Sequence, residues 1–213
     1  MARANTVESN RLKNASPETT DRFLTTPNVL TVLRIVLTPV FLVLIFAGSW
    51  YFKILALLVF TLASLTDFYD GKIARRDGTI TSFGRFMDPL ADKLLVSAAL
   101  IAFVILGMVE AWLIGAMLVR DVGITALRIY AVQRGKVVVT SRLAKWKTML
   151  QLVLIFGLLV FLNIRIVSTE FSNQPAPLFG DVAYWVMNAL VGVVTFLAVV
   201  SGIRYLIENR KTF

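Results

Sequence analysis

Residues 51–73 read YFKILALLVFTLASLTDFYDGKI, an apolar run that ends in two aspartates and a lysine. An α-helix rises 1.5 Å per residue, so about 20 apolar residues are enough to cross a bilayer. This stretch is long enough to do so, and its last turns carry acidic side chains at membrane depth. It predicts a transmembrane helix with a polar end, and a helical membrane protein around it.

Five further apolar runs accompany this one along a chain of 213 residues. Gly48 and Gly107 mark tight connections, Pro39 is expected to kink the first helix, and Ser172 to Gly180 form the longest outer loop. The apolar runs predict six transmembrane helices, at 28–48, 51–73, 84–107, 111–133, 145–164 and 182–207.

The first 26 residues differ from the rest because they are polar and mixed in charge. They lack the apolar core of a signal peptide. We expect residues 1–26 to be a cytoplasmic tail, either with a short interfacial helix near its end or disordered. Residues 27–213 then form one all-α membrane domain that carries the site.

The composition excludes several kinds of chemistry. Hydrophobic residues make up 57% of the chain, more than a water-soluble domain usually carries, and Cys and His are absent. Their absence excludes disulfides, thiolate nucleophiles, phosphohistidine intermediates and imidazole metal ligands. The net charge of +9 fits contact with anionic lipid, and we expect no nucleic-acid binding because no soluble basic and aromatic platform is present.

The basic residues predict the orientation in the membrane. Of the 22 lysines and arginines, only Lys53 and Arg165 fall near the loops on one side, and Arg120 lies within a span. Positive charge accumulates on the cytoplasmic side, so both termini are expected there. Aromatic residues agree with this orientation, because five of them mark the outer ends of the spans: Trp50, Tyr51, Trp112, Tyr184 and Trp185.

Four aspartates lie at the cytoplasmic ends of the second and third spans: Asp67, Asp70, Asp88 and Asp92. The members of each pair are three or four positions apart, so they share one face of their helix. A short loop makes the two helices antiparallel neighbours whose acidic faces can oppose each other. Four close carboxylates repel in a low dielectric, and Mg²⁺ or Mn²⁺ is the natural occupant of an all-oxygen site. Two ions would balance the charges, and one ion with a shared proton is the alternative.

A structural role is the other interpretation of these aspartates. They could pair with the basic residues around them and hold the two helices together: Arg75, Arg76, Arg85 and Lys93. We favour a functional site, because ionisable side chains are costly at membrane depth and four of them exceed what packing requires.

The spacing of these residues resembles a known signature. Asp67-x2-Asp70-Gly71-x2-Ala74-Arg75-x8-Gly84-x3-Asp88-x3-Asp92 is similar to the full motif of the CDP-alcohol phosphotransferase family, with every fixed position present. The resemblance implies transfer of a phosphatidyl group from CDP-diacylglycerol to an alcohol. It implies that the first three aspartates bind the metal and that Asp92 is both a ligand and the general base.

The resemblance also implies a pocket for the CDP-linked lipid. The motif residues expected to line it are Gly71, Ala74, Arg75 and Gly84, and Thr81 in the connecting loop is a further candidate. Asn28, Thr31 and Arg34 share one helical face of the first span and resemble a pattern found near the nucleotide in this family. The alternative for these three is an N-cap together with an arginine that snorkels toward the headgroups.

Basic residues near the connection of the fourth and fifth spans are candidates for holding a phosphate of the acceptor: Arg120, Arg128, Arg142, Lys145 and Lys147. The positive-inside bias would explain a surplus here, but Arg120 lies too deep for a loop charge, although Asp121 could be its partner. Residues 142–151 are similar to phosphatidylglycerophosphate synthases, which implies glycerol 3-phosphate as the acceptor. Ala144 and Asp121 depart from that pattern, so inositol phosphate and phosphatidylglycerol stay open.

Two other interpretations stay open. A cation transporter could use the aspartates as a transport site, although such sites tend to lie near the bilayer midplane. A family member without activity could bind lipid only. The resemblance further implies a homodimer in the cytoplasmic membrane of a bacterium.

Overall fold

The computed structural model describes residues 26–77, 82–134, 142–172 and 180–209, and within these ranges the fold is all-helical. It includes the backbone but not the side chains of residues 26–30, 67–77, 82–89, 92, 132, 142–145 and 172. The predicted tail and most of the predicted outer loop lie outside the described residues. The helices are α2 (Thr26–Phe46), α3 (Trp50–Asp77), α4 (Ser82–Ile105), α5 (Ala111–Gln133), α6 (Arg142–Ser172) and α7 (Asp181–Glu208).

Each helix coincides with one of the predicted apolar runs, and the main difference is the length of α6. The prediction ended the fifth run at residue 164, before Arg165, whereas α6 continues to Ser172. A charged residue ends an apolar run but does not end a helix, because the backbone hydrogen bonds continue. In this last part Thr169 donates its hydroxyl to the carbonyl oxygen of Arg165, so the side chain is satisfied within the helix.

Apolar surface covers much of the molecule. Two helical stretches, Trp146–Phe171 in α6 and Asp181–Glu208 in α7, are long and apolar enough to cross a membrane. Shorter apolar stretches occur in three other helices: Thr31–Phe46, Trp50–Thr66 and Lys93–Ile105. Large apolar side chains such as Val119 and Trp185 are 75% and 70% exposed, which suits lipid and not water. These features are consistent with a membrane protein.

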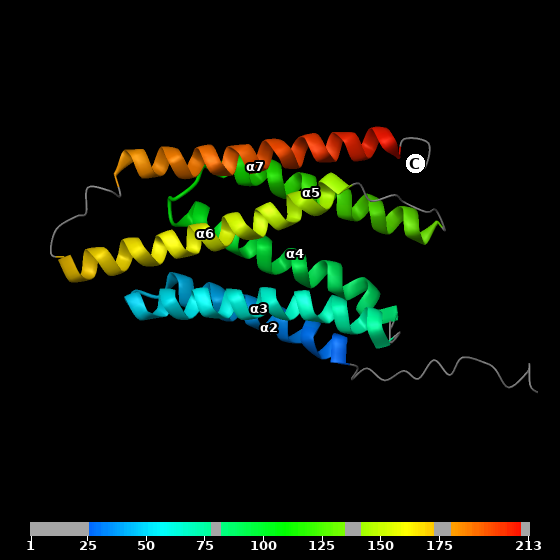
Figure 1. The fold of residues 1–213 in the computed structure, drawn as a ribbon, viewed down its shortest axis with the longest axis horizontal. Coiled ribbons are helices and arrows are strands. Elements are labelled where there is room, and N and C mark those ends of the chain that lie inside the picture. Colours follow the sequence, from blue (N-terminus) through cyan, green and yellow to red (C-terminus); the bar gives the residue numbers. More distant parts are fainter. Residues whose placement is uncertain (1–25, 78–81, 135–141, 173–179, 210–213) are drawn as a thin grey trace, which may run out of the picture.

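The helices run alternately back and forth along one bundle (Figure 1). Helix α2 packs against α3 and α4, α6 contacts α3, α4 and α7, and α5 lies between α4 and α7. A single apolar core joins them, and its largest fully buried aromatic side chains are Phe41, Phe60 and Phe103. The six helices therefore form one bundle, in which α4 and α6 connect the pair α2 and α3 to the pair α5 and α7.

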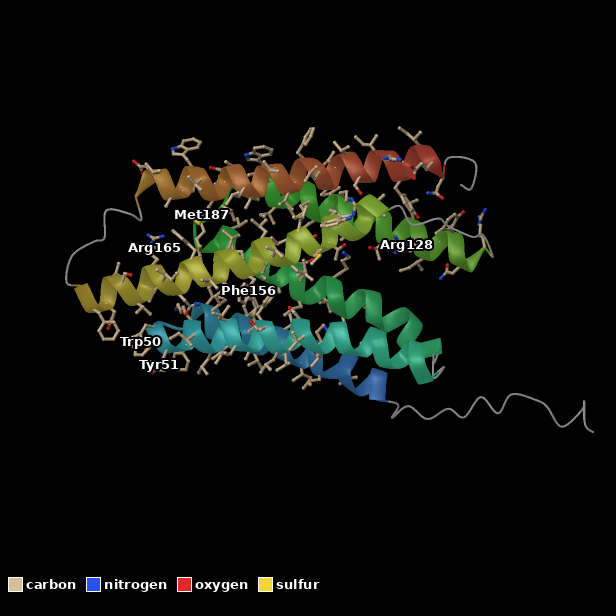
Figure 2. The ribbon with its side chains drawn as sticks, in the orientation of Figure 1. Trp50, Tyr51, Arg128, Phe156, Arg165 and Met187 are labelled. Carbon is tan, nitrogen blue, oxygen red and sulfur yellow. The ribbon has the colours of Figure 1, made fainter. Side chains whose placement is uncertain are left out.

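Three helix ends and three helix starts meet at one end of this bundle, on the right in Figure 1. Helices α3, α5 and α7 end there, and α2, α4 and α6 begin there. We call it the motif end, because the predicted aspartates lie on α3 and α4 near it. Figure 2 shows Trp50 and Tyr51 at the opposite end, where the orientation analysis placed the outer aromatic residues.

Candidate active site at the motif end

The backbone brings the two halves of the acidic motif to the same end of the bundle. Asp67 and Asp70 lie in the last turns of α3, and Asp88 and Asp92 lie in the first turns of α4. The connection from Asp77 to Ser82 contains four residues and can span at most about 18 Å, so the helix ends must stay close. The four aspartate side chains lie outside the described part of the structure, so their facing one another stays a prediction.

The side chains of the other motif positions also lie outside the described part of the structure. Gly71, Ala74 and Arg75 are helical in α3 and Gly84 is helical in α4, whereas Thr81 lies outside the described residues. Among the side chains that the structure does describe, no three carboxylates form a group that could hold a metal ion. The donor set itself suits a hard divalent cation, because it consists of carboxylate oxygens without His or Cys.

Arg34 connects α2 to α3 beside the motif. Its side chain is only 1% exposed, and its Nε donates to the carbonyl oxygen of Ala63 at 3.4 Å, one turn before Asp67. Thr31, one turn earlier on α2, is also buried. Arg34 is therefore packed inside the bundle and does not snorkel to its surface. Its predicted role near the nucleotide stays a prediction.

A second group of polar residues lies between α4, α5, α6 and α7. We call it the Asp121 cluster, and it consists of Lys93, Arg120, Asp121, Lys147 and Gln151. Asp121 is at its centre and is 3% exposed. Its carboxylate receives hydrogen bonds from Arg120 Nη1, at 3.0 Å, and from Lys147 Nζ, at 2.6 Å to Oδ2. Arg120 thus pairs with Asp121, which the sequence left open as the alternative to a phosphate-binding role.

The amine of Lys147 has three oxygen partners. Its Nζ contacts both carboxylate oxygens of Asp121 and the side-chain oxygen of Gln151, one turn along α6. An ammonium group has three N–H donors, so these three oxygens match its whole capacity. Both Lys147 and Gln151 are buried, and within the described part of the chain the amide nitrogen of Gln151 has no hydrogen-bond partner.

Arg120 crosses from α5 to α7. Its Nε donates to the carbonyl oxygen of Ala198 and its Nη2 to the hydroxyl of Ser201, both at 2.9 Å. Gly202 leaves the space for the side chain, because a Cβ atom there would lie 2.9 Å from Arg120 Cγ. The guanidinium therefore links two helices, and two of its five N–H donors have no partner among the described residues.

Lys93 is the fourth charged member and comes from α4. Its Nζ lies 3.8 Å from Asp121 Oδ2, and its side chain is 24% exposed. Among the side chains that the structure describes, Lys93 forms its ion pair with Asp121 on α5. The alternative pairing of Lys93 with the motif aspartates involves side chains outside that part and stays untested. The cluster thus ties the helix that carries Asp88 and Asp92 to the other half of the bundle.

The predicted phosphate-binding residues do not all join this cluster. Arg120 and Lys147 belong to it, and Arg128 is exposed on α5 toward the motif end (Figure 2). The side chains of Arg142 and Lys145 lie outside the described part. Sequence reasoning missed the roles of Lys93, Gln151, Ser201 and Gly202; for Gln151 the signal was its i+4 spacing from Lys147.

Comparison with known proteins agrees with the motif. The profile of the CDP-alcohol phosphatidyltransferase family matches residues 24–200. A protein of Bacillus subtilis named CDP-diacylglycerol–glycerol-3-phosphate 3-phosphatidyltransferase is 35% identical over 86% of this chain and 94% of its own length. A protein of the same name from Rickettsia bellii is 34% identical over 88% and 96%. A probable phosphatidylglycerophosphate synthase of Mycobacterium tuberculosis is 40% identical over 69% and 73%.

Proposed function

Because this chain belongs to the CDP-alcohol phosphatidyltransferase family, we propose that it transfers the phosphatidyl group of CDP-diacylglycerol to glycerol 3-phosphate. The products are phosphatidylglycerophosphate and CMP. The observation that carries the proposal is the complete motif from Asp67 to Asp92, which the fold brings to one end of α3 and α4. Relatives that align over nearly their whole length bear the name of this reaction.

The proposed setting is a bacterial cytoplasmic membrane crossed by all six helices, with both termini and the motif end on the cytoplasmic side. The alternating course of the helices supports this topology (Figure 1). The excess of Lys and Arg near the motif end supports the orientation. The polar cytidine diphosphate head of the lipid could then reach the site at the cytoplasmic side while its acyl chains stay in the bilayer.

The donor set supports a metal-dependent site. We assign Mg²⁺ or Mn²⁺, as two ions, to Asp67, Asp70, Asp88 and Asp92. When bound, such ions neutralise the pyrophosphate and the charge that develops on the departing CMP. Because these four carboxylates carry four negative charges in a small region, they also repel one another strongly without a cation.

The remaining chemistry falls to the residues of the chain. Asp92 accepts the proton of the acceptor hydroxyl. At the same time the hydroxyl oxygen forms a bond to the phosphatidyl phosphorus, and the bond from this phosphorus to CMP breaks. Gly71, Ala74 and Gly84 have small or no side chains, which leaves room for the nucleotide to approach the backbone. Arg75 offers a charged donor to its phosphates.

The Asp121 cluster supports an acceptor that carries a phosphate. It contains two more cations than anions among Lys93, Arg120, Asp121 and Lys147, and it lies largely buried. A buried excess of positive charge is costly unless an anion compensates it. We place the acceptor's phosphate beside this cluster, with Arg128, Arg142 and Lys145 as further cations around the entrance. We also propose that the protein forms a homodimer, as the family resemblance implies.

The test is CMP release by the purified protein from CDP-diacylglycerol with Mg²⁺ or Mn²⁺. The acceptors are glycerol 3-phosphate, inositol phosphate, inositol, serine and phosphatidylglycerol, each in turn. We expect release with glycerol 3-phosphate, its loss in excess chelator, and its return when the metal is restored. No release with any acceptor, or full activity in chelator, contradicts the reaction; release with another acceptor alone contradicts the choice of glycerol 3-phosphate.

A further inference from the structure

Among the described residues, Lys93 differs from the other cations of the Asp121 cluster because its amine makes no hydrogen bond. Its charged partner within this part of the chain is Asp121, with Nζ and Oδ2 3.8 Å apart, which is beyond hydrogen-bond distance. Lys147 has oxygens for all three of its N–H groups, and Arg120 makes three hydrogen bonds. Lys93 is thus the cation of this cluster with capacity for a further ligand.

Asp121 does not use the N–H donors of Lys93, because its Oδ2 lies 3.8 Å from Nζ and it already has two closer cations. Its Oδ1 already accepts hydrogen bonds from Arg120 and Lys147, and its Oδ2 accepts one from Lys147. The two cations that bind it closely more than neutralise its charge. The charge of Lys93 is therefore left to be balanced by an anion that comes from elsewhere, and the partial exposure of its side chain allows such an anion to reach it.

The position of Lys93 in α4 indicates which anion would bind there. Lys93 directly follows Asp92 in α4, and Asp92 is the carboxylate assigned to take the proton of the acceptor hydroxyl. An anionic group bound at Lys93 would keep the acceptor at the turn of α4 that carries Asp92. We propose that Lys93 binds the phosphate of the acceptor, an inference that rests on the proposed function and extends it to a residue outside the predicted phosphate-binding set.

The residues of the Asp121 cluster then have separate roles in binding the phosphate. Lys147 neutralises Asp121 and is fixed by Gln151, so the carboxylate does not repel an incoming phosphate. Arg120 can add its two remaining N–H donors, since Ser201 and Ala198 hold the guanidinium in place. Lys93 adds a compact positive charge from α4, on the side of the motif aspartates.

The experiment measures the KM for glycerol 3-phosphate and the KM for CDP-diacylglycerol in Lys93→Met and Lys93→Arg, with Mg²⁺ present. We expect the acceptor KM to rise about 10- to 100-fold in Lys93→Met, which is what loss of one charge-assisted hydrogen bond produces. The KM for CDP-diacylglycerol should change less than twofold or so, and Lys93→Arg should recover a large part of the acceptor KM because it keeps the charge.

The matched control is Lys53→Met, which removes another buried lysine, from α3 at the opposite end of the bundle. It should leave both KM values unchanged. A KM does not depend on the fraction of folded enzyme, so partial unfolding of a variant does not hide the result. An unchanged acceptor KM in Lys93→Met, or an equal rise of both KM values, overturns the inference while the wild-type activity still supports the proposed function. If the wild type uses only acceptors without phosphate, the inference falls together with the choice of acceptor.

Discussion

Gly202 and Arg120 lie in such close contact that a Cβ atom at Gly202 would be 2.9 Å from Arg120 Cγ and 3.1 Å from its Nε. Real Cβ atoms do not approach neighbours so closely, and Cγ is not the mobile end of the side chain. Glycine at position 202 is therefore what allows Arg120 to lie across α7 and reach Ala198 and Ser201.

Gly202→Ala should displace Arg120 from α7 and disturb its contact with Asp121. We expect a lower melting temperature in detergent and a rise of several-fold in the KM for glycerol 3-phosphate, because the guanidinium loses charge-assisted hydrogen bonds. The control is Gly192→Ala on the same helix, where the new Cβ would lie 3.9 Å from Leu113 Cδ2, an ordinary contact. Equal behaviour of the two variants would show that Arg120 does not depend on Gly202.

Asp92→Asn should abolish CMP release while CDP-diacylglycerol still binds. The amide keeps the shape of the side chain but cannot take the proton of the acceptor hydroxyl. Turnover measured beside equilibrium binding of the CDP-linked lipid separates the two roles. Asp181→Asn, on α7 at the opposite end, is the control for loss of one carboxylate, and it should retain activity. Strong turnover by Asp92→Asn would remove this residue from the role of base.

The helices were predictable because an apolar run of about 20 residues has few alternatives to a helix in a membrane. The motif positions were predictable because their spacing is local: Asp67 and Asp70, or Asp88 and Asp92, depend only on the geometry of one helix. The pairing of Arg120 with Asp121 followed from their adjacency. The end of α6 was placed too early because Arg165 interrupts the apolar run without interrupting the helix.

The Asp121 cluster was not predictable in the same way. Lys93 and Asp121 meet because α4 and α5 pack together, and Arg120 meets Ser201 because α5 and α7 lie in one particular register. Neither relation is encoded in a local spacing. Gly202 gave no signal either, since a glycine within an apolar helix has many possible reasons and its contact with Arg120 appears only in three dimensions.

Arg34 offers a test of the α2–α3 contact beside the motif. Arg34→Met should lower the melting temperature, because it removes the hydrogen bond from Arg34 to the carbonyl oxygen of Ala63, a loss of about 0.5–1.5 kcal/mol. The carbonyl oxygen keeps the hydroxyl of Thr66 as a donor, at 2.8 Å. If Arg34 also serves the nucleotide, the KM for CDP-diacylglycerol should rise, and Arg34→Lys should recover it only in part.

The control for Arg34 is Arg165→Met, which removes an exposed arginine at the opposite end (Figure 2). It should change stability by less than about 0.5 kcal/mol. A lower melting temperature of Arg34→Met with an unchanged KM for CDP-diacylglycerol would limit Arg34 to a structural role and remove it from the predicted lipid pocket.

Asn188 should matter for stability and not for catalysis. Its side-chain oxygen accepts a hydrogen bond from the backbone N–H of Glu110 at 2.8 Å, and its amide donates to the carbonyl oxygens of Tyr184 and Met108 at 3.0 and 3.4 Å. It thereby holds the turn at Gly107, where φ is 67°, against α7 at the end remote from the motif.

Asn188→Ala leaves the Glu110 N–H and the Met108 carbonyl without their partner, so it should lower the free energy of unfolding by about 1–3 kcal/mol. Asn188→Asp keeps the acceptor for Glu110 and loses the donors, and an unpaired charge replaces them, so it should not restore the wild-type melting temperature. Both KM values should stay at the wild-type level in Asn188→Ala, because the Asp121 cluster and the motif lie near the other end. A selective rise in the acceptor KM of this variant would mean that the turn at Gly107 is coupled to the active site through α5.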